Sequence, residues 1–212
     1  MSKPRGSTSR LNQVFKLASP GERGASRRAV LAHALPCFNA RGIEAATIED
    51  LRQRSGQSVG TIYHHFGNKE GVAAALFFAG FDDQSRAIAT RTEAVADAQA
   101  VVVELVTAYV DWVTALPELA AFLFMARETV AQGPHGDALR ERLEARYAPI
   151  DARLAESVRA GLLAELPAEL IPALVLGGAE SYCRGWLAGR REAKPAAYAG
   201  LLAEAAWRGI SA

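Results

Sequence analysis

Residues 47–70 constrain the fold most, because they carry the start and stop signals of two consecutive short helices. Thr47 predicts the start of the first helix, since its hydroxyl can accept a hydrogen bond from a free amide of the first turn; Asp50 stands where it completes a capping box. Gly56 predicts a left-handed turn that ends this helix. Ser58 predicts the start of a second short helix. The segment is therefore expected to form a helix, a tight turn and another helix.

The second helix is unusually polar for a segment of this length. It offers hydroxyls, imidazoles and, just beyond it, an ammonium group on Thr61, Tyr63, His64, His65 and Lys69. Such groups suit phosphates and base edges, and a stable core would not need them. Two other interpretations remain open, namely that Tyr63 and His65 pack between this segment and the rest of the chain, or that His64 and His65 bind a metal. Adjacent helical residues diverge by about 100°, which disfavours the metal site.

Composition bounds the class of protein. Half of the 212 residues are hydrophobic, which is enough for a large core in one domain or two closely packed ones. No run of about 18 apolar residues lacks a charge, so neither a membrane span nor a membrane partner is expected. The first 20 residues lack the apolar core of a secretory signal, and the two cysteines, Cys37 and Cys183, suit the core of a protein in a reducing compartment. These features predict a cytoplasmic protein.

Charge is divided unevenly along the chain. Residues 1–70 hold eleven Lys or Arg against five Asp or Glu, a net charge of +6, whereas residues 71–212 hold thirteen against eighteen, a net charge of −5. Neutralising phosphates supplies most non-specific DNA affinity, so a basic end fits a DNA-binding domain carried by a separate body. A chance fluctuation of solvated surface charge is the alternative.

Hydrophobic periodicity predicts an all-α fold without strands. The expected parts are a flexible basic arm at residues 1–24 with a hint of one short helix, a helix-turn-helix domain at 25–70, and a helical domain at 71–212. Pro36 lies inside the first helix of the second part, where we expect either a kink or a helix displaced from residues 26–40. Helices are expected at residues 26–40, 69–90 with Asn68 as N-cap, 94–115, 118–131, 136–163, 168–190 and 196–210, in addition to the two short ones.

The turn and second helix match a known pattern. This part of the chain closely resembles the signature of the TetR (tetracycline-repressor) family of bacterial transcription regulators. The matching residues are Gly56-x-Ser58-x-Gly60-Thr61-Ile62-Tyr63-x-His65-Phe66-x-Asn68-Lys69-Glu70. The specific resemblance covers about residues 26–72, and Arg52, Ser55 and Gln57 depart from the family's small or apolar residues. The resemblance implies an N-terminal three-helix helix-turn-helix domain followed by a helical ligand-binding and dimerisation domain.

The resemblance also implies roles for individual residues. Val59 would meet a thymine methyl and Gly60 would let the backbone approach DNA closely, while His65 and Lys69 would hold phosphates. Ile62 and Phe66 are expected to be scaffold. The expected DNA-binding residues are Arg28, Thr47, Ser58, Val59, Gly60, Thr61, Tyr63, His64, His65 and Lys69.

In the remainder of the chain, two sets of residues are expected to act. The family implies a homodimer formed by the last two helices, for which the candidates are Leu174, Gly178, Tyr182, Trp186, Tyr198, Leu201 and Leu202. Aromatic-rich stretches predict an apolar ligand pocket lined by Phe78, Phe81, Tyr109, Trp112, Phe122, Met125 and Tyr147. Plain core packing would explain both sets equally well.

Together these features predict a DNA-binding transcriptional regulator, most simply a repressor, that occupies a palindromic double-stranded operator as a homodimer and is released by a small-molecule effector of apolar character. No catalytic residue, metal ligand or cofactor site is expected. A helical enzyme is disfavoured because the sequence offers no nucleophile with its base, no metal-ligand spacing and no phosphate-binding loop. A ligand-independent interaction protein that has lost its DNA is the third alternative.

Overall fold

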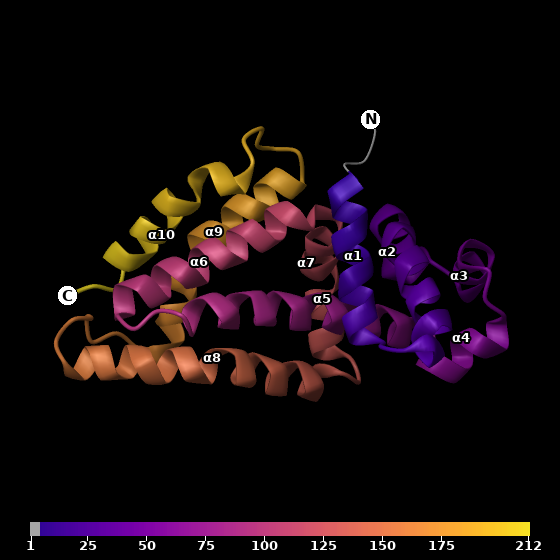
Figure 1. Cartoon of the computed structure of the whole chain (residues 1–212), viewed down its shortest axis with the longest axis horizontal. Helices are drawn as coiled ribbons and strands as arrows, with labels where there is room; N and C mark the ends of the chain where they lie inside the picture. Colours follow the sequence, from indigo (N-terminus) through magenta and orange to yellow (C-terminus); the bar gives the residue numbers. More distant parts are fainter. Residues whose placement is uncertain (1–4) are drawn as a thin grey trace. The chain divides into compact units, whose positions relative to one another are not determined.

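The structure, a computed structural model, describes residues 5–212, with side chains from Ser9 onward except that of Ala168. The fold is all-α, as expected, and the described residues contain no strand, only an isolated bridge between Leu163 and Ser211. The helices, shown in Figure 1, are α1 Arg5–Ala18, α2 Ala25–Ala45, α3 Ile48–Ser55, α4 Val59–Phe66, α5 Lys69–Thr92, α6 Ala98–Ala115, α7 Pro117–Gln132, α8 Gly136–Arg159, α9 Ile171–Leu187 and α10 Ala199–Arg208. Short 3-10 helices precede α2, α9 and α10 at Glu22–Gly24, Ala168–Leu170 and Pro195–Tyr198.

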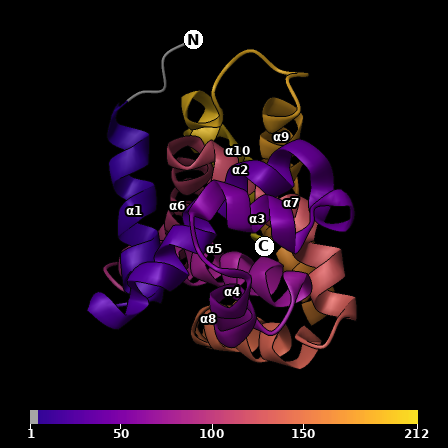
Figure 2. The ribbon, with the colours of Figure 1, turned by 90° about the vertical axis from the view of Figure 1, so that its right-hand side faces the viewer.

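The helix-turn-helix segment has its own apolar centre. The side chains of Leu35 and Phe38 on α2, Leu51 on α3 and Ile62 on α4 are fully buried. Figure 2 shows α3 and α4 together at one end of this part of the molecule, with α1 to one side. One face of each short helix is thus committed to the core, and the opposite face is left to solvent.

The break in α2 differs from the expected one. We expected a kink at Pro36, but the only non-helical backbone angles inside α2 are at Gly42, with φ 79° and ψ 164°. Glycine has no Cβ and adopts positive φ at little cost, so the chain turns there before α3 begins. The helix also runs longer than the expected residues 26–40.

The segment expected as a flexible arm is mostly helical. α1 covers Arg5–Ala18, longer than the short helix hinted at by the sequence, and it buries Val14 and Phe15. These apolar side chains attach α1 to α2, because their exclusion from water outweighs what a free arm would gain in chain entropy. Residues 1–4 of the expected arm lie outside the described residues.

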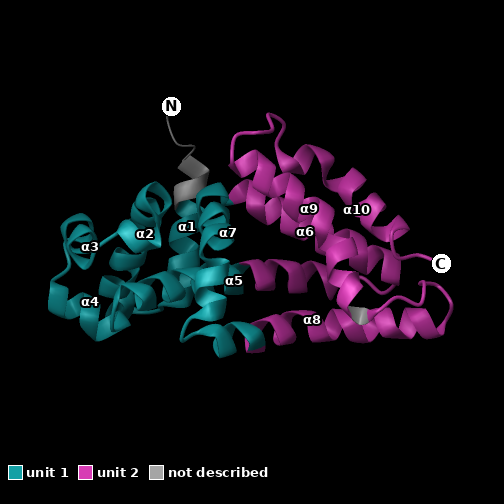
Figure 3. Ribbon diagram, turned by 180° about the vertical axis from the view of Figure 1, so that it is seen from behind, with its two compact units in different colours: residues 1–83, 116–140 teal, residues 84–115, 141–212 magenta. Residues whose placement is uncertain are grey.

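The chain divides into two compact units, coloured separately in Figure 3. The first takes in residues up to Asp83 and Leu116–Arg140, and the second takes in Gln84–Ala115 and Glu141–Ala212. Helices α5 and α8 therefore contribute to both. This division does not follow the boundary expected at residue 70, so the functional domain limits stay a prediction.

α6 is the central helix of the second unit. It has the length and the mean hydropathy, 1.2, of a membrane span, but it carries Glu104 and Asp111 and buries its apolar face against α9 and α10. The helices that follow are shorter than expected: α8 ends at Arg159, α9 starts at Ile171 with Pro172 in its first turn, and α10 starts at Ala199. Proline fits the first turn of a helix because the N–H groups there have no acceptor within the helix, so its lack of an N–H costs no hydrogen bond.

Both cysteines are core residues, as expected. Cys37 and Cys183 are free and fully buried. Burial, followed by the charge of Glu180, raises the pKa of Cys183 to about 12, so this thiol remains protonated at neutral pH.

Candidate DNA-binding interface

The start of α3 is held by the capping box that the sequence predicts. The main-chain N–H of Asp50 donates to Thr47 Oγ1 at 3.1 Å, and the N–H of Thr47 donates to Asp50 Oδ2 at 3.0 Å. The hydrogen bonds from the Thr47 hydroxyl and then from its main chain lower the pKa of the Asp50 carboxyl, which also pairs with Arg41 at 2.8 Å. The ionised carboxylate thus closes the first turn of α3.

The tight turn between α3 and α4 follows the prediction. Gly56 has φ 68° and ψ 10°, the left-handed conformation, and its N–H donates to the Arg52 carbonyl at 3.0 Å. Ser58 then caps α4, because its hydroxyl accepts from the N–H of Thr61 at 3.0 Å. These local bonds fix where α4 starts and therefore which of its side chains face outward.

The outward face of α4 carries the side chains expected to meet DNA. Tyr63 is 50% exposed and Val59 39% exposed, and Ser58, Gly60 and His64 are exposed as well. Thr61 and His65 are half-buried, and the Thr61 hydroxyl shares a hydrogen bond with Ser58 Oγ at 2.9 Å. A surface that only meets water does not need an exposed tyrosine and an exposed valine on one short helix. Both side chains suit contacts in a major groove.

The inward face of α4 is held by α2. Ile62 is fully buried, as expected, and Phe66 is half-buried with the Arg27 guanidinium 4.6 Å from its ring centroid. The same guanidinium donates to the main-chain oxygen of His65 at 2.9 Å, and partial burial lowers the pKa of Arg27. Arg27 therefore fixes the C-terminal end of α4 to the start of α2.

Two of the expected phosphate contacts have partners within the protein. Lys69 Nζ donates to the Glu44 carbonyl at 2.6 Å, which joins the start of α5 to the end of α2. Arg28 donates to the carbonyls of Ser19 and Gly21 at 2.6 and 2.7 Å, which closes the loop between α1 and α2. An ammonium group has three donors and a guanidinium has five, and both Arg28 bonds come from one nitrogen, so each residue keeps donors for a phosphate. Contact of either residue with DNA stays a prediction.

These ties were not visible in the sequence. Their acceptors are main-chain carbonyls, which every residue carries, so the sequence holds no signal for Arg27 to His65 or Lys69 to Glu44. The pairing of Arg41 with Asp50 was equally hidden.

No three His, Cys, Asp or Glu side chains come together as a metal-ligand set within residues 5–212. The rings of His64 and His65 lie edge to face, with centroids 5.2 Å apart.

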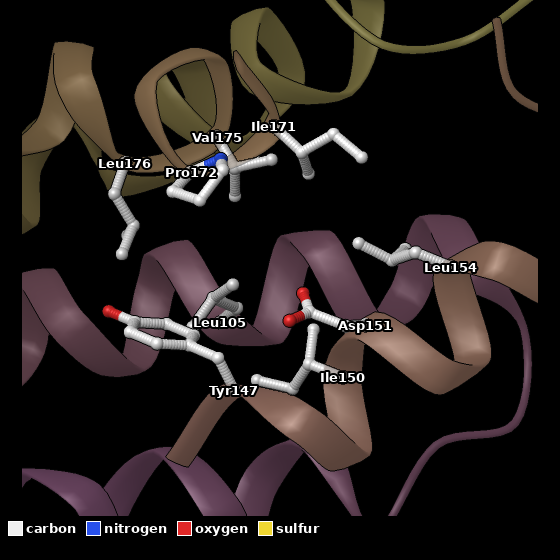
Figure 4. A pocket seen from close by; sticks show the side chains of 9 residues that line it. All are labelled: Leu105, Tyr147, Ile150, Asp151, Leu154, Ile171, Pro172, Val175 and Leu176. Carbon is white, nitrogen blue, oxygen red and sulfur yellow. The ribbon is translucent and has the colours of Figure 1, made fainter. Parts of the chain in front are cut away.

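The expected ligand-pocket residues are scattered. In the first unit Phe122 is fully buried and stacks on Phe38, with ring centroids 5.8 Å apart. Phe81 stacks on Phe77, and Phe78 meets His135 edge to face. The side chain of Met125 is 40% exposed. In the second unit Tyr109 and Trp112 are buried in α6. Only Tyr147 of the expected set lines the apolar pocket between α6, α8 and α9, shown in Figure 4. Phe122 is fully buried, as core packing requires, and a ligand pocket lined by the expected residues stays a prediction.

The expected dimer residues lie largely on open surface. Leu201 is 65% exposed, Leu174 and Tyr198 are 40% exposed, and an added Cβ at Gly178 would meet nothing within 4 Å. Tyr182, Trp186 and Leu202 are half-buried, and the Tyr182 and Tyr198 rings meet edge to face at 5.4 Å beside an open groove that Leu201 and Leu202 also line. Together they form an apolar face on α9, the 3-10 helix Pro195–Tyr198 and α10 that the described part of the chain leaves open.

A capped helix, a left-handed glycine turn and a second helix with a polar outer face make a helix-turn-helix, an arrangement typical of DNA-binding proteins. The model of the family described as "Bacterial regulatory proteins, tetR family" matches residues 30–76. The HTH-type transcriptional repressor AcnR of Corynebacterium glutamicum is 45% identical over 51 residues, which are 24% of this chain and 27% of that protein. The match thus spans about a quarter of that curated relative.

Solved structures extend the likeness to nearly the whole fold. A TetR family transcription regulator from Marinobacter aquaeolei VT8 has a TM-score of 0.76 and 18% identity, covering 89% of this chain and 97% of that one. The transcriptional regulator FadR from Bacillus subtilis, solved in complex with stearoyl-CoA, has a TM-score of 0.70 and 18% identity, covering 86% of this chain and 98% of that one. Residues 30–76 thus match the tetR family, and the fold of most of the chain is similar to that of a solved TetR family regulator.

Proposed function

We propose that this protein is a transcriptional repressor that binds a palindromic operator as a homodimer in the cytoplasm and releases it when a small molecule binds the second unit. The observation that carries the proposal is the outer face of α4, where Val59 and Tyr63 are exposed on a helix whose start and end are both fixed. A rigid helix with an exposed reading face loses little entropy when it enters a groove.

The homodimer is supported by the uncovered apolar face on α9 and α10. Leu174, Tyr198 and Leu201 would be costly to leave in water, and the glycines at 177 and 178 allow another helix to approach closely. A two-fold axis would carry two copies of α4 to two half-sites, which is why a palindrome is expected.

The small-molecule effector is supported by the similar fold of FadR, which was solved with stearoyl-CoA, and by the apolar pocket of the second unit. The effector must bind the DNA-bound and the released forms with different affinities, since a ligand with equal affinity for both would shift nothing. The curated relative AcnR is a repressor, which supports repression as the direction of control.

Selection of binding sites from random DNA duplexes tests the proposal. An enriched inverted repeat supports it, and the spacing of its half-sites should be about one helical turn or a multiple. Mobility shifts on the selected duplex at several salt concentrations should give a steep loss of affinity with salt, because each neutralised phosphate releases counterions. Absence of any enriched sequence, or affinity that stays flat with salt, would contradict it.

A further inference from the structure

The excess positive charge of residues 1–70 is confined to the first 28 of them. Residues 1–28 hold seven Lys or Arg against one Glu, a net charge of +6, whereas residues 29–70 hold four against four, a net charge of zero. Lysines and arginines that neutralise phosphates supply most non-specific DNA affinity. The helix-turn-helix at α3 and α4 therefore lacks the net charge that attraction to a duplex requires.

Two of the four cations in residues 29–70 are also paired with carboxylates. Arg41 lies 2.8 Å from Asp50, and Arg52 lies 2.6 Å from Glu49. A carboxylate this close to a guanidinium repels the phosphate that the guanidinium would attract, so each pair contributes little net attraction. Most of the attraction for the DNA backbone must therefore come from the N-terminal segment.

The turn between α1 and α2 is held next to the C-terminal end of α4. In Figure 1 the chain leaves the lower end of α1 and runs towards α4 before α2 begins. Arg27, in the first turn of α2, donates to the main-chain oxygen of His65 at 2.9 Å, and Arg28 donates to the Ser19 carbonyl at 2.6 Å. Gly24 packs so closely that an added Cβ would lie 2.3 Å from the same Ser19 oxygen. The turn is thus fixed in its place beside α4.

Two cations near this turn have no partner among the described residues. Lys16, in the last turn of α1, and Arg23, in the 3-10 helix Glu22–Gly24, are exposed. No described residue forms an ion pair or a hydrogen bond with either side chain. Arg10, earlier in α1, instead lies 3.9 Å from Asp83. The charges of Lys16 and Arg23 are therefore left for a phosphate.

A hollow between α1 and α2 brings a second cation close to Lys16. Its volume is about 320 Å³, well above the roughly 30 Å³ that one water molecule occupies. Lys16 and Arg28 line it from the two helices, and the other lining residues are Asn12, Phe15, Ala29 and Ala32. Both carbonyl bonds of Arg28 come from one nitrogen, so its other donors are left over. Two cations and an amide around one hollow suit a phosphate oxygen.

Arg23 is within reach of the groove that α4 would enter. Four residues of chain lead from Arg23 to Arg27, a span of at most about 14 Å. The major groove of DNA is about 12 Å wide, and a row of phosphates borders it on each side. With α4 in the groove, the turn before α2 can therefore reach one of these rows.

We propose that the end of α1 and the turn after it bind the sugar-phosphate backbone of the duplex that α4 reads, with Lys16 and Arg23 each neutralising one phosphate. The proposal deepens the proposed function and rests on it, because the duplex is the same partner. Contacts to phosphates carry no sequence information, so this surface supplies affinity while α4 supplies specificity.

Lys16→Gln combined with Arg23→Gln in the full chain tests the proposal on two duplexes, the operator obtained by site selection and a duplex of mixed sequence. Fluorescence anisotropy gives the affinities at several salt concentrations. Each lost phosphate contact lowers the slope of log affinity against log salt by about 0.9, so the double variant should lose about two. At about 0.15 M salt this loss corresponds to binding about thirtyfold weaker on both duplexes. The preference for the operator should stay within about twofold.

The matched control is Arg127→Gln combined with Arg159→Gln, which removes two exposed charges from α7 and α8. It should keep the slope and the affinity of the unaltered protein. Both double variants should keep the thermal midpoint, because all four side chains are exposed. An unchanged slope in the variant of Lys16 and Arg23, or equal losses in both variants, overturns the proposal.

Failure of the proposed function gives a different result. Site selection without an enriched repeat contradicts the operator, while the duplex of mixed sequence still tests the phosphate contacts, because these do not depend on sequence. A protein that binds neither duplex overturns both proposals.

Discussion

Arg27 donates a hydrogen bond to the main-chain oxygen of His65 at 2.9 Å, although 38 residues separate them along the chain. The acceptor lies in the last turn of α4, where carbonyls have no partner within the helix. Because the guanidinium also lies 4.6 Å from the centre of the Phe66 ring, one side chain holds the end of α4 in two ways. Arg27 is a positioning residue for the helix that would read DNA.

Replacing Arg27 with Ala should weaken operator binding by about tenfold while leaving the salt dependence of binding unchanged, because no phosphate contact is lost. The free energy of unfolding should fall by about 1–2 kcal/mol, the usual size of such a bond. Mobility shifts at several salt concentrations and urea unfolding measure the two effects. Arg54→Ala, which removes an exposed charge on α3, is the control for charge alone. A slope reduced by about one in Arg27→Ala would instead identify Arg27 as a phosphate contact.

Tyr63→Ala should weaken operator binding by about 1–3 kcal/mol, as expected for a residue that touches base edges. The side chain is 50% exposed, so the thermal midpoint should hardly change, since surface substitutions usually stay within about 0.5 kcal/mol. Tyr63→Phe separates the contribution of the hydroxyl from that of the ring. Operator binding of unaltered strength in Tyr63→Ala would remove Tyr63 from the interface.

Leu201→Glu should convert the proposed dimer into monomers, because a carboxylate cannot be buried without a partner at the centre of an apolar face. Sedimentation equilibrium measures the change, and operator binding should weaken in parallel. Leu162→Glu is the control, since Leu162 is a similarly exposed leucine, 58% against 65%, in the loop after α8. A dimer that persists in Leu201→Glu would show that this face is not the interface.

Gly80→Ala should destabilise the first unit although alanine favours helix. An added Cβ on α5 would lie 2.6 Å from Leu123 Cδ1 and 3.0 Å from Leu119 Cγ, so the side chains of these two leucines on α7 must shift. Overpacking of this kind costs about 1–3 kcal/mol, measured by urea unfolding. Gly60→Ala is the matched control: its Cβ would meet only Ser58 Oγ at 3.8 Å, so it should gain about 0.5–1 kcal/mol from helix propensity. Equal effects in the two variants would contradict the packing shown here.

Asp50→Asn should lower stability at neutral pH and lose this effect in acid. The folded protein lowers the pKa of Asp50, so the ionised carboxylate stabilises the fold above its unfolded pKa, about 3.9, and this contribution disappears as pH falls through the folded value. Urea unfolding from pH 6 downward should show the two proteins converging below about pH 4. A difference that stays constant with pH would mean that the charge of Asp50 plays no part in the cap.

Features that depend on residues close together in the sequence were predicted, whereas contacts between distant residues were not. The caps at Thr47 and Ser58 and the turn at Gly56 were predicted correctly, because each depends on residues no more than four positions apart. The kink expected at Pro36 was wrong, since proline kept its place in α2 and Gly42 turned the chain instead. Either Pro36 or Gly42 could interrupt α2 by its backbone preferences, and the packing of the surrounding helices selects Gly42.

What the sequence determined by itself was the all-α class, the helix-turn-helix with its polar outer face and the family it resembles, because periodicity and capping are written in the side chains. Only the tertiary structure decided that Arg27 holds the end of α4, that Lys69 holds the start of α5, and that Phe122 stacks on Phe38. Those outcomes depend on which side chains and main-chain carbonyls meet after long stretches of chain have packed, and a main-chain carbonyl is the same in every residue.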